Sequence, residues 1–270
     1  MGSVTVQAET TVNPLTLMGY EAGVCWGAKA LGDPAKDFAR GVDCLQSGHM
    51  RTAEFPQVYL ILDGYSARVI RELYTHIGGA PTRLQASTRY IDYKNFDFII
   101  PPSIENNIDA HSDYCEAMDC INDAIQNLLK KGISKEDAAN LLPLGMTTKI
   151  VLRTNLRNLI DMSHQRMCTR AYWEFRKLMS DIIVALKNYS DEWKILIDEY
   201  KVFQPKCDVC GFCTEKDSCG RQPKKDDLAQ RLLAEIKVSK NDLTEFLNNF
   251  IKKLKTGELD NIKEDYVDKI

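Results

Sequence analysis

The segment 74–93 (Y-T-H-I-G-G-A-P-T-R-L-Q-A-S-T-R-Y-I-D-Y) concentrates hydrogen-bond donors around a Gly-Gly-Ala-Pro turn. The side chains in it that could hold a ligand are His76, Arg83, Gln85, Ser87, Thr88 and Arg89. The two guanidinium groups present fork-shaped donors that suit phosphate or carboxylate oxygens. Gly78 and Gly79 allow the backbone to approach a ligand closely or to adopt a positive φ. A polar turn with solvated arginines would explain any one of these residues, but it explains the whole set poorly.

A second group with possible chemistry is a run of cysteines. Cys207, Cys210, Cys213 and Cys219 follow the pattern C-x2-C-x2-C-x5-C. Four thiolates can close a tetrahedral zinc site or hold an iron–sulfur cluster, and zinc is the preferred metal here. The spacing differs from the two well-separated cysteine pairs of a zinc ribbon. A reduced, metal-free loop, or a loop able to form a disulfide, is therefore an equal alternative to a structural metal site.

Length and composition restrict the class of protein. The chain has 270 residues, 44% hydrophobic and 27% charged, which suits one large domain or a domain with an appendage. The net charge of -3 disfavours a general nucleic-acid binder. No apolar run approaches the roughly 20 residues of a membrane span, and the first 14 residues do not resemble a signal peptide. The nine cysteines are an odd number and unevenly spread, so we expect a reducing cytoplasm.

The first third of the chain predicts the elements that would carry the donor-rich segment. Residues 15–31 are small and apolar and predict an early core element, and residues 35–46 predict a short helix. Residues 58–62 (V-Y-L-I-L) predict a buried strand that ends in a turn at 63–64. Residues 66–74 predict a short helix that brings His76 to the glycine turn.

The rest of the chain predicts mostly helices. One spans 107–132, and a second short helix, capped by Ser134, ends before Pro143. Residues 147–186 predict two further helices, and 191–200 predict the last helix of the main body. The composition changes near residue 205, which predicts two domains, 1–204 and 205–270. Two amphipathic helices are expected in the second of these, near 226–236 and 239–255.

Three blocks of the chain resemble the flavin-dependent thymidylate synthase family when taken in this order. They are G-H-M-R-T-A-E-F at 48–55, Q-A-S-T-R-Y at 85–90, and the L-P-L and V-L-R-T-N-L-R-N-L segments between 142 and 166. The resemblance covers about 15–200. It implies an α+β fold, a mixed α/β single domain, here with a helical C-terminal extension, and a homotetramer whose FAD sites lie between subunits. It also implies conversion of dUMP to dTMP with 5,10-methylenetetrahydrofolate and reduced FAD, NADPH being the expected reductant.

The resemblance also implies roles for single residues. Ser87, Thr88 and Arg89 would hold the phosphate and sugar of dUMP, and Arg166 would face the uracil ring and stabilise negative charge that develops there. The implied FAD contacts are Thr52, His76, Gln85, Asn155 and Arg157, with Gln85 touching the nucleotide as well. A protein nucleophile is not required, because the cofactor carries the hydride chemistry.

The chain departs from the family pattern around His76. Where the family has Arg-His-Arg, this chain has Thr-His-Ile at 75–77, and the step from His76 to Ser87 is two residues longer. An arginine of the family before the L-P pair is also missing here. We hypothesise that Arg83 replaces the lost charge on the dUMP phosphate, with Arg153 as a second candidate. Two alternatives remain: an enzyme that acts on another pyrimidine nucleotide or methyl donor, and a regulator that binds nucleotide or flavin without catalysis.

Overall fold

The computed structural model describes residues 2–27, 29, 31–228, 245, 248, 249 and 252. The chain divides into two compact units, Met1–Val209 and Cys210–Ile270, and the predicted boundary at 204/205 lies a few residues before this division. The two amphipathic helices expected near 226–236 and 239–255 fall almost entirely outside the described residues. The elements that position the candidate site all belong to the first unit.

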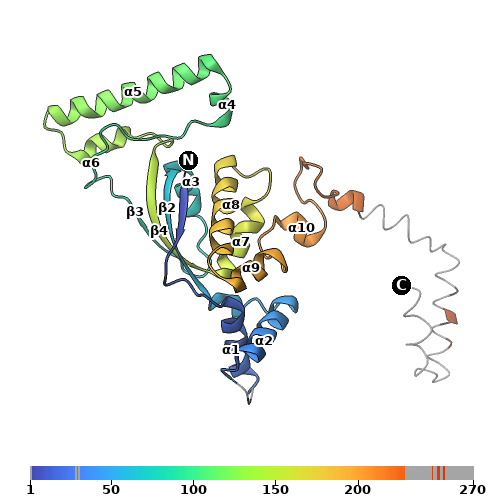
Figure 1. Ribbon diagram of the computed structural model, residues 1–270. Helices are drawn as coiled ribbons and strands as arrows, with labels where there is room; N and C mark the ends of the chain where they lie inside the picture. Colours follow the sequence, from blue (N-terminus) through green and yellow to red (C-terminus); the bar gives the residue numbers. More distant parts are fainter. Residues whose placement is uncertain are drawn as a thin grey trace. The chain divides into compact units, whose positions relative to one another are not determined.

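A four-stranded antiparallel sheet lies at the centre of the first unit (Figure 1). Its strands are β1 (Ser3–Val6), β2 (Gln57–Ser66), β3 (Thr82–Gln85) and β4 (Thr147–Asn155), in the order β1-β2-β4-β3. All three pairings are antiparallel, with the long strands β2 and β4 side by side in the middle. The glycine turn and the predicted nucleotide-binding block therefore lie at the two ends of the edge strand β3.

Strand β4 corrects the sequence prediction of a helix that begins at residue 147. Thr148, Ile150, Leu152 and Thr154 are buried, whereas Lys149 and the other alternate residues point to the opposite face. This period of two is that of a half-buried strand, and the β-branched residues suit it. The prediction was wrong because the helical pattern that starts at residue 156 was extended backwards over a strand. Two helices do follow, α7 (Leu156–Arg166) and α8 (Trp173–Lys187).

Strand β2 corrects a second prediction, the turn at 63–64. The strand continues to Ser66, and the register against β4 shifts between Asp63 and Tyr65, as in a β-bulge. Gly64 has a φ of 74°, which places the extra residue in the left-handed region that glycine tolerates. The glycine therefore marks an irregularity within the strand and not its end.

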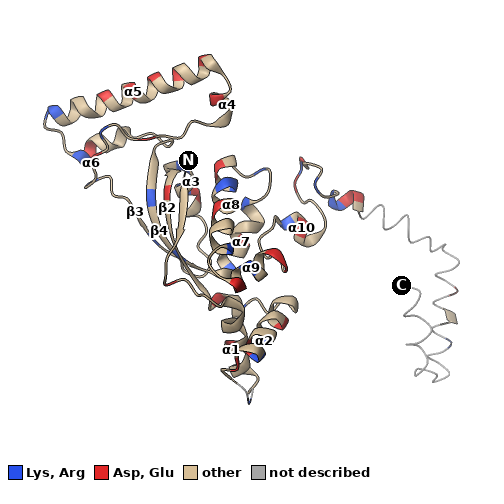
Figure 2. Cartoon of the chain, viewed as in Figure 1, with Lys and Arg blue, Asp and Glu red and all other residues tan. Residues whose placement is uncertain are grey.

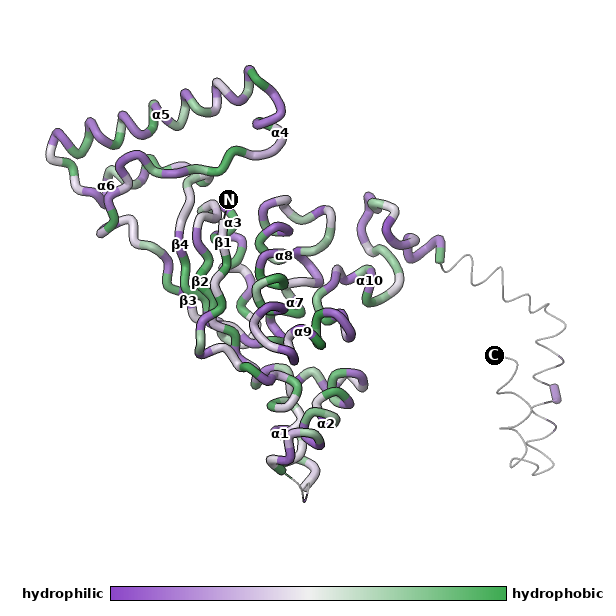
Figure 3. Tube along the Cα trace, in the orientation of Figure 1, coloured by the Kyte–Doolittle hydropathy of each residue, from purple (hydrophilic) through white to green (hydrophobic). Residues whose placement is uncertain are grey.

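Helices α3 (Ala67–Leu73), α7, α8 and α9 (Asp191–Asp198) cover one face of the sheet (Figure 1). Figure 3 shows hydrophobic segments concentrated in β2, β4 and these helices. The largest fully buried side chains of this layer include Trp193, Tyr65, Phe175, Leu60, Ile150 and Leu152. Trp193 is fixed by a hydrogen bond from its indole Nε1 to the carbonyl of Thr11 at 2.8 Å, so α9 is tied to the segment that precedes Pro14.

Two helices form a hairpin below the sheet, α1 (Pro14–Cys25) and α2 (Pro34–Gln46). They pack with their backbones almost in contact, because a Cβ on Gly41 would overlap the carbonyl of Leu15. The 3-10 helix η1 (Thr52–Glu54) leads from this hairpin into β2. The early core element expected at 15–31 is thus helix α1, with Leu15 and Met18 fully buried.

A third group of helices connects β3 to β4: α4 (Pro102–Glu105), α5 (Ile108–Lys130), α6 (Lys135–Ala138) and η2 (Ala139–Leu141). Helix α5 buries only Met118 and Ile125, and Figure 2 shows acidic residues along its length. Ser134 caps α6 as expected, accepting a hydrogen bond from the backbone N–H of Asp137 at 3.2 Å. Within the described part of the chain, no helix combines the length and the apolar character that a membrane crossing needs.

Candidate active site

Helix α3 places His76 beside the core, because both ends of this helix are fixed. Ser66 caps its first turn, accepting a hydrogen bond from the N–H of Val69 at 3.2 Å. The buried carboxylate of Glu174 in turn accepts from the N–H of Ser66 at 2.7 Å and from its hydroxyl at 2.5 Å. His76 follows the last turn of α3 and is only 7% exposed. The predicted delivery of His76 by a short helix is confirmed.

The side chain of Arg166, from the end of α7, meets His76 in this corner. Its Nε donates to Nε2 of His76 at 2.9 Å, and its Nη1 pairs with the carboxylate of Glu72 at 2.9 Å. Its Nη2 lies 3.4 Å from the hydroxyl of Thr75. The guanidinium carbon lies 4.7 Å from the centre of the buried Phe175 ring, a cation–π distance. Two residues predicted for different ligands, Arg166 for dUMP and His76 for FAD, are therefore hydrogen-bonded to each other.

The protonation state of His76 follows from these neighbours. Burial, and then the nearby charges of Arg166 and Arg83, lower the pKa of His76 to about 4. The imidazole is consequently neutral near pH 7. Because Nε2 accepts the hydrogen bond from Arg166, the ring proton sits on Nδ1. His76 thus acts as an acceptor and adds no positive charge of its own.

Arg83 and Arg153, the two predicted replacements for the missing arginines, both bind the backbone of the glycine turn. Arg83 donates from Nη2 to the carbonyl of His76, and its guanidinium lies 5.1 Å from the centre of the Tyr74 ring. Arg153 donates from Nη2 to the carbonyl of Ala80 at 3.3 Å. Both have a buried Nε without a hydrogen-bond partner. Burial also lowers the pKa of Arg83.

The glycine turn packs against two asparagines of α7. Asn155 caps this helix, accepting from the N–H of Asn158 at 2.8 Å. A Cβ on Gly78 would lie 2.9 Å from the side-chain oxygen of Asn158, and a Cβ on Gly79 would overlap the side-chain nitrogen of Asn155. Gly79 also has a φ of 66°. The positive φ and the close approach were both expected of these glycines, but the group they approach is the amide pair of the protein itself.

A cavity of about 250 Å³ opens at this contact. It is lined by Glu54, Gly78, Gly79, Asn155, Arg157, Asn158 and Asp161. Arg157, one of the lining residues, is paired through Nη1 with the carboxylate of Glu54 at 2.5 Å. Thr52 lies in η1 with Glu54, and its hydroxyl donates to the carbonyl of His49 at 2.9 Å. The structure therefore gathers three of the predicted FAD residues, Asn155, Arg157 and Thr52, at one end of the sheet.

A second cavity, of about 380 Å³, continues along the outer side of α7. It shares Arg157 and Asp161 with the first, and its other walls come from the end of α2, from His164 and from the segment 200–204. Burial lowers the pKa of His164, with Asp161 opposing this shift and Lys206 adding to it. The two cavities together follow one face of α7 from Arg157 to His164.

The predicted nucleotide block lies at the other end of β3. Gln85 pairs with Ile150 in the sheet, and its amide lies 3.4 Å from the hydroxyl of Thr148. Ser87 accepts from the N–H of Arg89 at 3.2 Å, which forms a local turn. Arg89 pairs with Glu136 at 3.1 Å, and both side chains are more than half exposed. This pairing places the block against α6.

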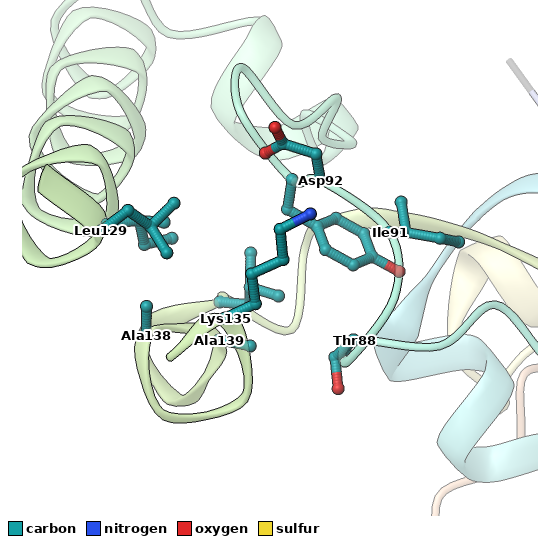
Figure 4. Close-up of a pocket in the computed structure, with 10 residues that line it drawn as sticks. Thr88, Ile91, Asp92, Leu129, Lys135, Ala138 and Ala139 are labelled. Atoms are coloured by element: carbon teal, nitrogen blue, oxygen red, sulfur yellow. The ribbon is translucent and has the colours of Figure 1, made fainter. Parts of the chain in front are cut away.

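Thr88 lines a small cavity between its own loop and helices α5 and α6 (Figure 4). In Figure 4, Lys135 extends from α6 toward the loop that carries Asp92, and Leu129 and Ala138 form the apolar side. The cavity has a volume of about 10 Å³, which admits at most a single water molecule. It is a packing gap and has no room for a nucleotide.

One copy of the chain brings Arg166 to His76 but does not bring the nucleotide block Ser87–Arg89 to the flavin residues Asn155 and Arg157. The N–H of Ala86 bonds the carbonyl of Lys149, whereas Asn155 stands at the far end of the same strand. Six strand residues separate these points, a distance of about 20 Å. Ser87, Thr88 and Arg89 thus lie at one end of β4, and Asn155 and Arg157 lie at the other.

The predicted metal ligands are divided between the two units. Cys207 belongs to the first unit, and Cys210, Cys213 and Cys219 belong to the second. In the parts of the chain that the structure describes, no three His, Cys, Asp or Glu side chains are arranged to hold a metal ion. The thiol of Cys210 instead donates to the carbonyl of Phe212 at 3.1 Å. A metal at these cysteines stays a prediction without support from the geometry.

Two residues around Arg166, Glu72 and Phe175, were not predicted as site residues, and Thr75 was named only as a departure from the family pattern. Glu72 lies in the last turn of α3 and His76 follows that turn four residues later, a spacing that the sequence could have indicated. Phe175 is fully buried in the core. Its second role, under the Arg166 guanidinium and beside the His76 ring, depends on a contact between residues far apart in the sequence, which sequence spacing does not give.

The comparisons with known proteins agree with the fold and the residue blocks. Residues 8–189 match the sequence model of the family described as "Thymidylate synthase complementing protein". A flavin-dependent thymidylate synthase of Nitratidesulfovibrio vulgaris is 30% identical over 189 residues, 66% of this chain and 74% of that protein. Another, of Clostridium tetani, is 28% identical over 244 residues, 82% of this chain and 94% of that protein.

Two solved structures share the architecture. A UMP/dUMP methylase from Streptomyces cacaoi, bound with 5-Br dUMP, has a TM-score of 0.63 at 14% identity, covering 76% of this chain and 98% of that one. Thymidylate synthase X from Helicobacter pylori, with FAD and dUMP, has a TM-score of 0.57 at 17% identity, and the match covers 74% of this chain and 100% of that one. These likenesses confirm the predicted mixed α/β fold. Together with the family match over residues 8–189, they show that the chain belongs to the flavin-dependent thymidylate synthase family.

Proposed function

We propose that this protein is a flavin-dependent thymidylate synthase, which methylates dUMP reductively to dTMP with 5,10-methylenetetrahydrofolate as carbon donor. When bound, reduced FAD supplies the hydride, and NADPH is the proposed source of electrons. The observation that carries the proposal is the oriented guanidinium of Arg166, which lies over Phe175 beside a neutral histidine. Such a preorganised cation suits the negative charge that develops on a uracil ring during methylation.

The residues around the glycine turn fit a flavin nucleotide by their chemistry. The cavity there offers amide groups from Asn155 and Asn158, glycine backbone at 78–79 and the guanidinium of Arg157. Polar groups of these types orient cofactors, and they bind phosphate and ring edges alike. A dinucleotide is larger than the drug-sized ligands that fill roughly 300–1,000 Å³, so it would extend beyond this cavity. The adjoining cavity along α7 provides further space.

In this proposal the chain's own residues bind and orient the two ligands. Asn155 and Arg157 would hold the flavin nucleotide, with Thr52 as an additional contact in the same region. Ser87, Thr88 and Arg89, with Gln85, would hold dUMP, and Arg166 would face its uracil ring. Glu54 is paired with Arg157 at 2.5 Å, so this carboxylate must share the guanidinium with any bound phosphate.

A second copy of the chain would complete the site in this scheme. Within one copy, Ser87–Arg89 lie about 20 Å along β4 from Asn155 and Arg157, so a nucleotide and a flavin held by these two groups would be too far apart for direct hydride transfer. The face of the sheet that the helices leave uncovered carries a row of apolar residues, in which Val151 is 37% and Leu84 73% exposed. We therefore propose a homotetramer in which each site combines residues from different subunits.

The nucleotide specificity has a second candidate. The chain has Thr75 and Ile77 where the family has two arginines, and Ile77 is 74% exposed, so this turn offers less positive charge. Because the Streptomyces cacaoi relative in fold is described as a UMP/dUMP methylase, UMP is the alternative substrate to test. A nucleotide- or flavin-binding regulator without catalysis is the non-enzymatic alternative.

The proposal is tested by purification of the protein and assay with dUMP or UMP, methylenetetrahydrofolate and NADPH. We expect a yellow protein whose flavin spectrum changes when dUMP is added, and formation of dTMP. Colourless protein that binds dUMP would indicate the regulator, and methylation of UMP alone would indicate the second substrate. Complementation of a thymidine-requiring host tests the same activity in cells.

Zinc at Cys207, Cys210, Cys213 and Cys219 is a separate proposal that rests only on the number and closeness of these thiols. Metal analysis of the purified full chain decides it. One equivalent of zinc that is lost on substitution of Cys213 by Ser would support the site. Well under one equivalent would end the proposal.

A further inference from the structure

The guanidinium of Arg166 is held by three side chains from one short stretch, Glu72, Thr75 and His76. They lie at positions i, i+3 and i+4 at the end of α3, so they share one face of the helix and its following turn. We call these three residues the Arg166 clamp. The clamp comes from the segment that departs most from the family's Arg-His-Arg pattern, since Thr75 itself stands at one of the lost arginines.

The clamp fixes both the position and the rotation of the guanidinium. Nε donates to His76 and Nη1 to Glu72, each at 2.9 Å, whereas Nη2 lies at the longer distance of 3.4 Å from Thr75. Phe175 covers one face of the planar group. A guanidinium has five N–H donors, and three are engaged here, so two on the outer nitrogens remain for a ligand. These remaining N–H groups lie in the plane of the guanidinium, whose orientation the clamp fixes.

Burial makes the ion pair within the clamp effective. The side chains of Arg166 and Glu72 are 20% and 27% exposed, so water screens their interaction only partly. His76 is almost fully buried, and its neutral ring accepts a hydrogen bond without adding charge. The arginine consequently has a fixed direction, and its charge is balanced by a carboxylate that is nearly as buried.

We propose that Glu72 and His76 are positioning residues, which orient Arg166 toward the pyrimidine ring of the bound nucleotide. This inference rests on the proposed function, because Arg166 must act on a nucleotide for its orientation to matter. Neither residue needs to touch the substrate. Misplacement of a reacting or stabilising group by about 1 Å can lower a rate by roughly 100-fold. Loss of the Glu72 or the His76 side chain should therefore lower kcat.

A double-mutant cycle distinguishes action through Arg166 from a general structural effect. We expect Glu72→Ala to lower kcat/KM for dUMP by about tenfold or more. In the Arg166→Ala background the same change should alter kcat/KM and the dUMP dissociation constant by less than about twofold, because the group that Glu72 orients is gone. Glu72→Gln, which keeps an acceptor oxygen, should restore most of the loss.

His76 is tested with two substitutions that differ in one property. His76→Gln keeps an acceptor near the place of Nε2 and should retain most of the activity at pH 7.5. His76→Leu removes the acceptor and should lower kcat/KM about as much as Glu72→Ala does. Asp198→Asn is the matched control, because it breaks the Lys187–Asp198 ion pair of 2.7 Å elsewhere in the same unit. This control should leave the kinetics unchanged.

Each outcome decides between the clamp and the proposed function. Wild-type protein that neither binds dUMP nor forms dTMP would overturn both. Active wild-type protein with near-normal Glu72→Ala and His76→Leu variants would overturn the clamp alone. Losses that simply add to that of Arg166→Ala would also overturn it, since they would show that Glu72 acts independently of Arg166. Flavin content and melting temperature, measured on every variant, identify a variant that has failed to fold.

Discussion

Gly79 lies so close to Asn155 that a Cβ on the glycine would overlap the amide nitrogen of the asparagine. The glycine belongs to the turn before β3, and the asparagine caps α7 at the end of β4. This contact joins two segments that are 76 positions apart, and it forms the wall of the cavity proposed for the flavin nucleotide. The family-like residue Asn155 and the divergent glycine turn are therefore parts of one packing unit.

Substitution of Gly79 by Ala should lower the free energy of unfolding by about 2 kcal/mol or more. A residue with a Cβ at a φ of 66° costs about 1–2 kcal/mol, and the overlap with Asn155 adds to this cost. Gly132→Ala is the matched control, since Gly132 has a φ of 82° but no neighbouring atom within 4 Å of the added Cβ. Urea denaturation of both variants measures the difference. Equal losses in the two variants would show that the contact with Asn155 contributes nothing.

Two substitutions of Asn155 should separate its capping role from ligand binding. Asn155→Ala removes the acceptor for the N–H of Asn158 and should cost about 1–2 kcal/mol of stability. Asn155→Ser keeps a capping oxygen and loses the amide, so its stability should stay within about 1 kcal/mol of the wild type. Both variants should nevertheless purify with less flavin. Full flavin content in Asn155→Ser would contradict the proposed contact between this amide and the cofactor.

Substitution of Arg83 by Ala should raise the KM for dUMP at least about tenfold, which corresponds to about 1.4 kcal/mol. The guanidinium donates to the carbonyl of His76 through Nη2, so an anion near the turn would be bound by its remaining Nη N–H groups. Arg83→Lys keeps the positive charge but lacks the paired N–H donors of a guanidinium, so its KM for dUMP should lie between those of the wild type and Arg83→Ala. The control Lys36→Ala removes an exposed charge from α2 and should have no effect. A wild-type KM in Arg83→Ala would rule out Arg83 as the replacement for the missing arginines.

Much of the fold follows from local sequence signals. Ser66 and Ser134 cap the helices that were expected after them, and Trp193 and Leu196 lie on the buried face of the helix expected at 191–200. These features depend on residues within a turn or two of each other. The strand β4 was missed because T-T-K-I-V-L-R-T-N runs directly into the cap of α7, so strand and helix share one continuous pattern.

The arrangement of the candidate site could be predicted from the sequence less well than the fold. The residue blocks identified the family, yet they did not show that Gln85 and Asn155 lie near opposite ends of the β3–β4 pair. That separation is set by the register of the sheet, which local patterns do not specify. The pairing of His76 with Arg166 likewise joins residues 90 positions apart. Long-range packing decides both relationships.

The histidine of that pair should make the fold sensitive to acid. The pKa of His76 is about 4 in the folded protein and 6.5 when the chain is unfolded. Between these values the unfolded chain binds a proton that the folded protein does not, so stability falls as the pH falls. The contribution of His76 is fully present above pH 6.5 and is lost by pH 4, a change of about 3 kcal/mol. Chemical denaturation at pH 7.5 and pH 4.5 measures this loss.

His76→Gln provides the comparison, since glutamine cannot take up the proton. The variant should lose less stability than the wild type between pH 7.5 and pH 4.5. His49→Gln is the control, because His49 is exposed and its substitution should leave the wild-type pH dependence in place. If His76→Gln and the wild type lose the same stability over this range, His76 is not held neutral by its burial and by Arg166. Its hydrogen bond with Arg166 would then have to form in a different protonation state.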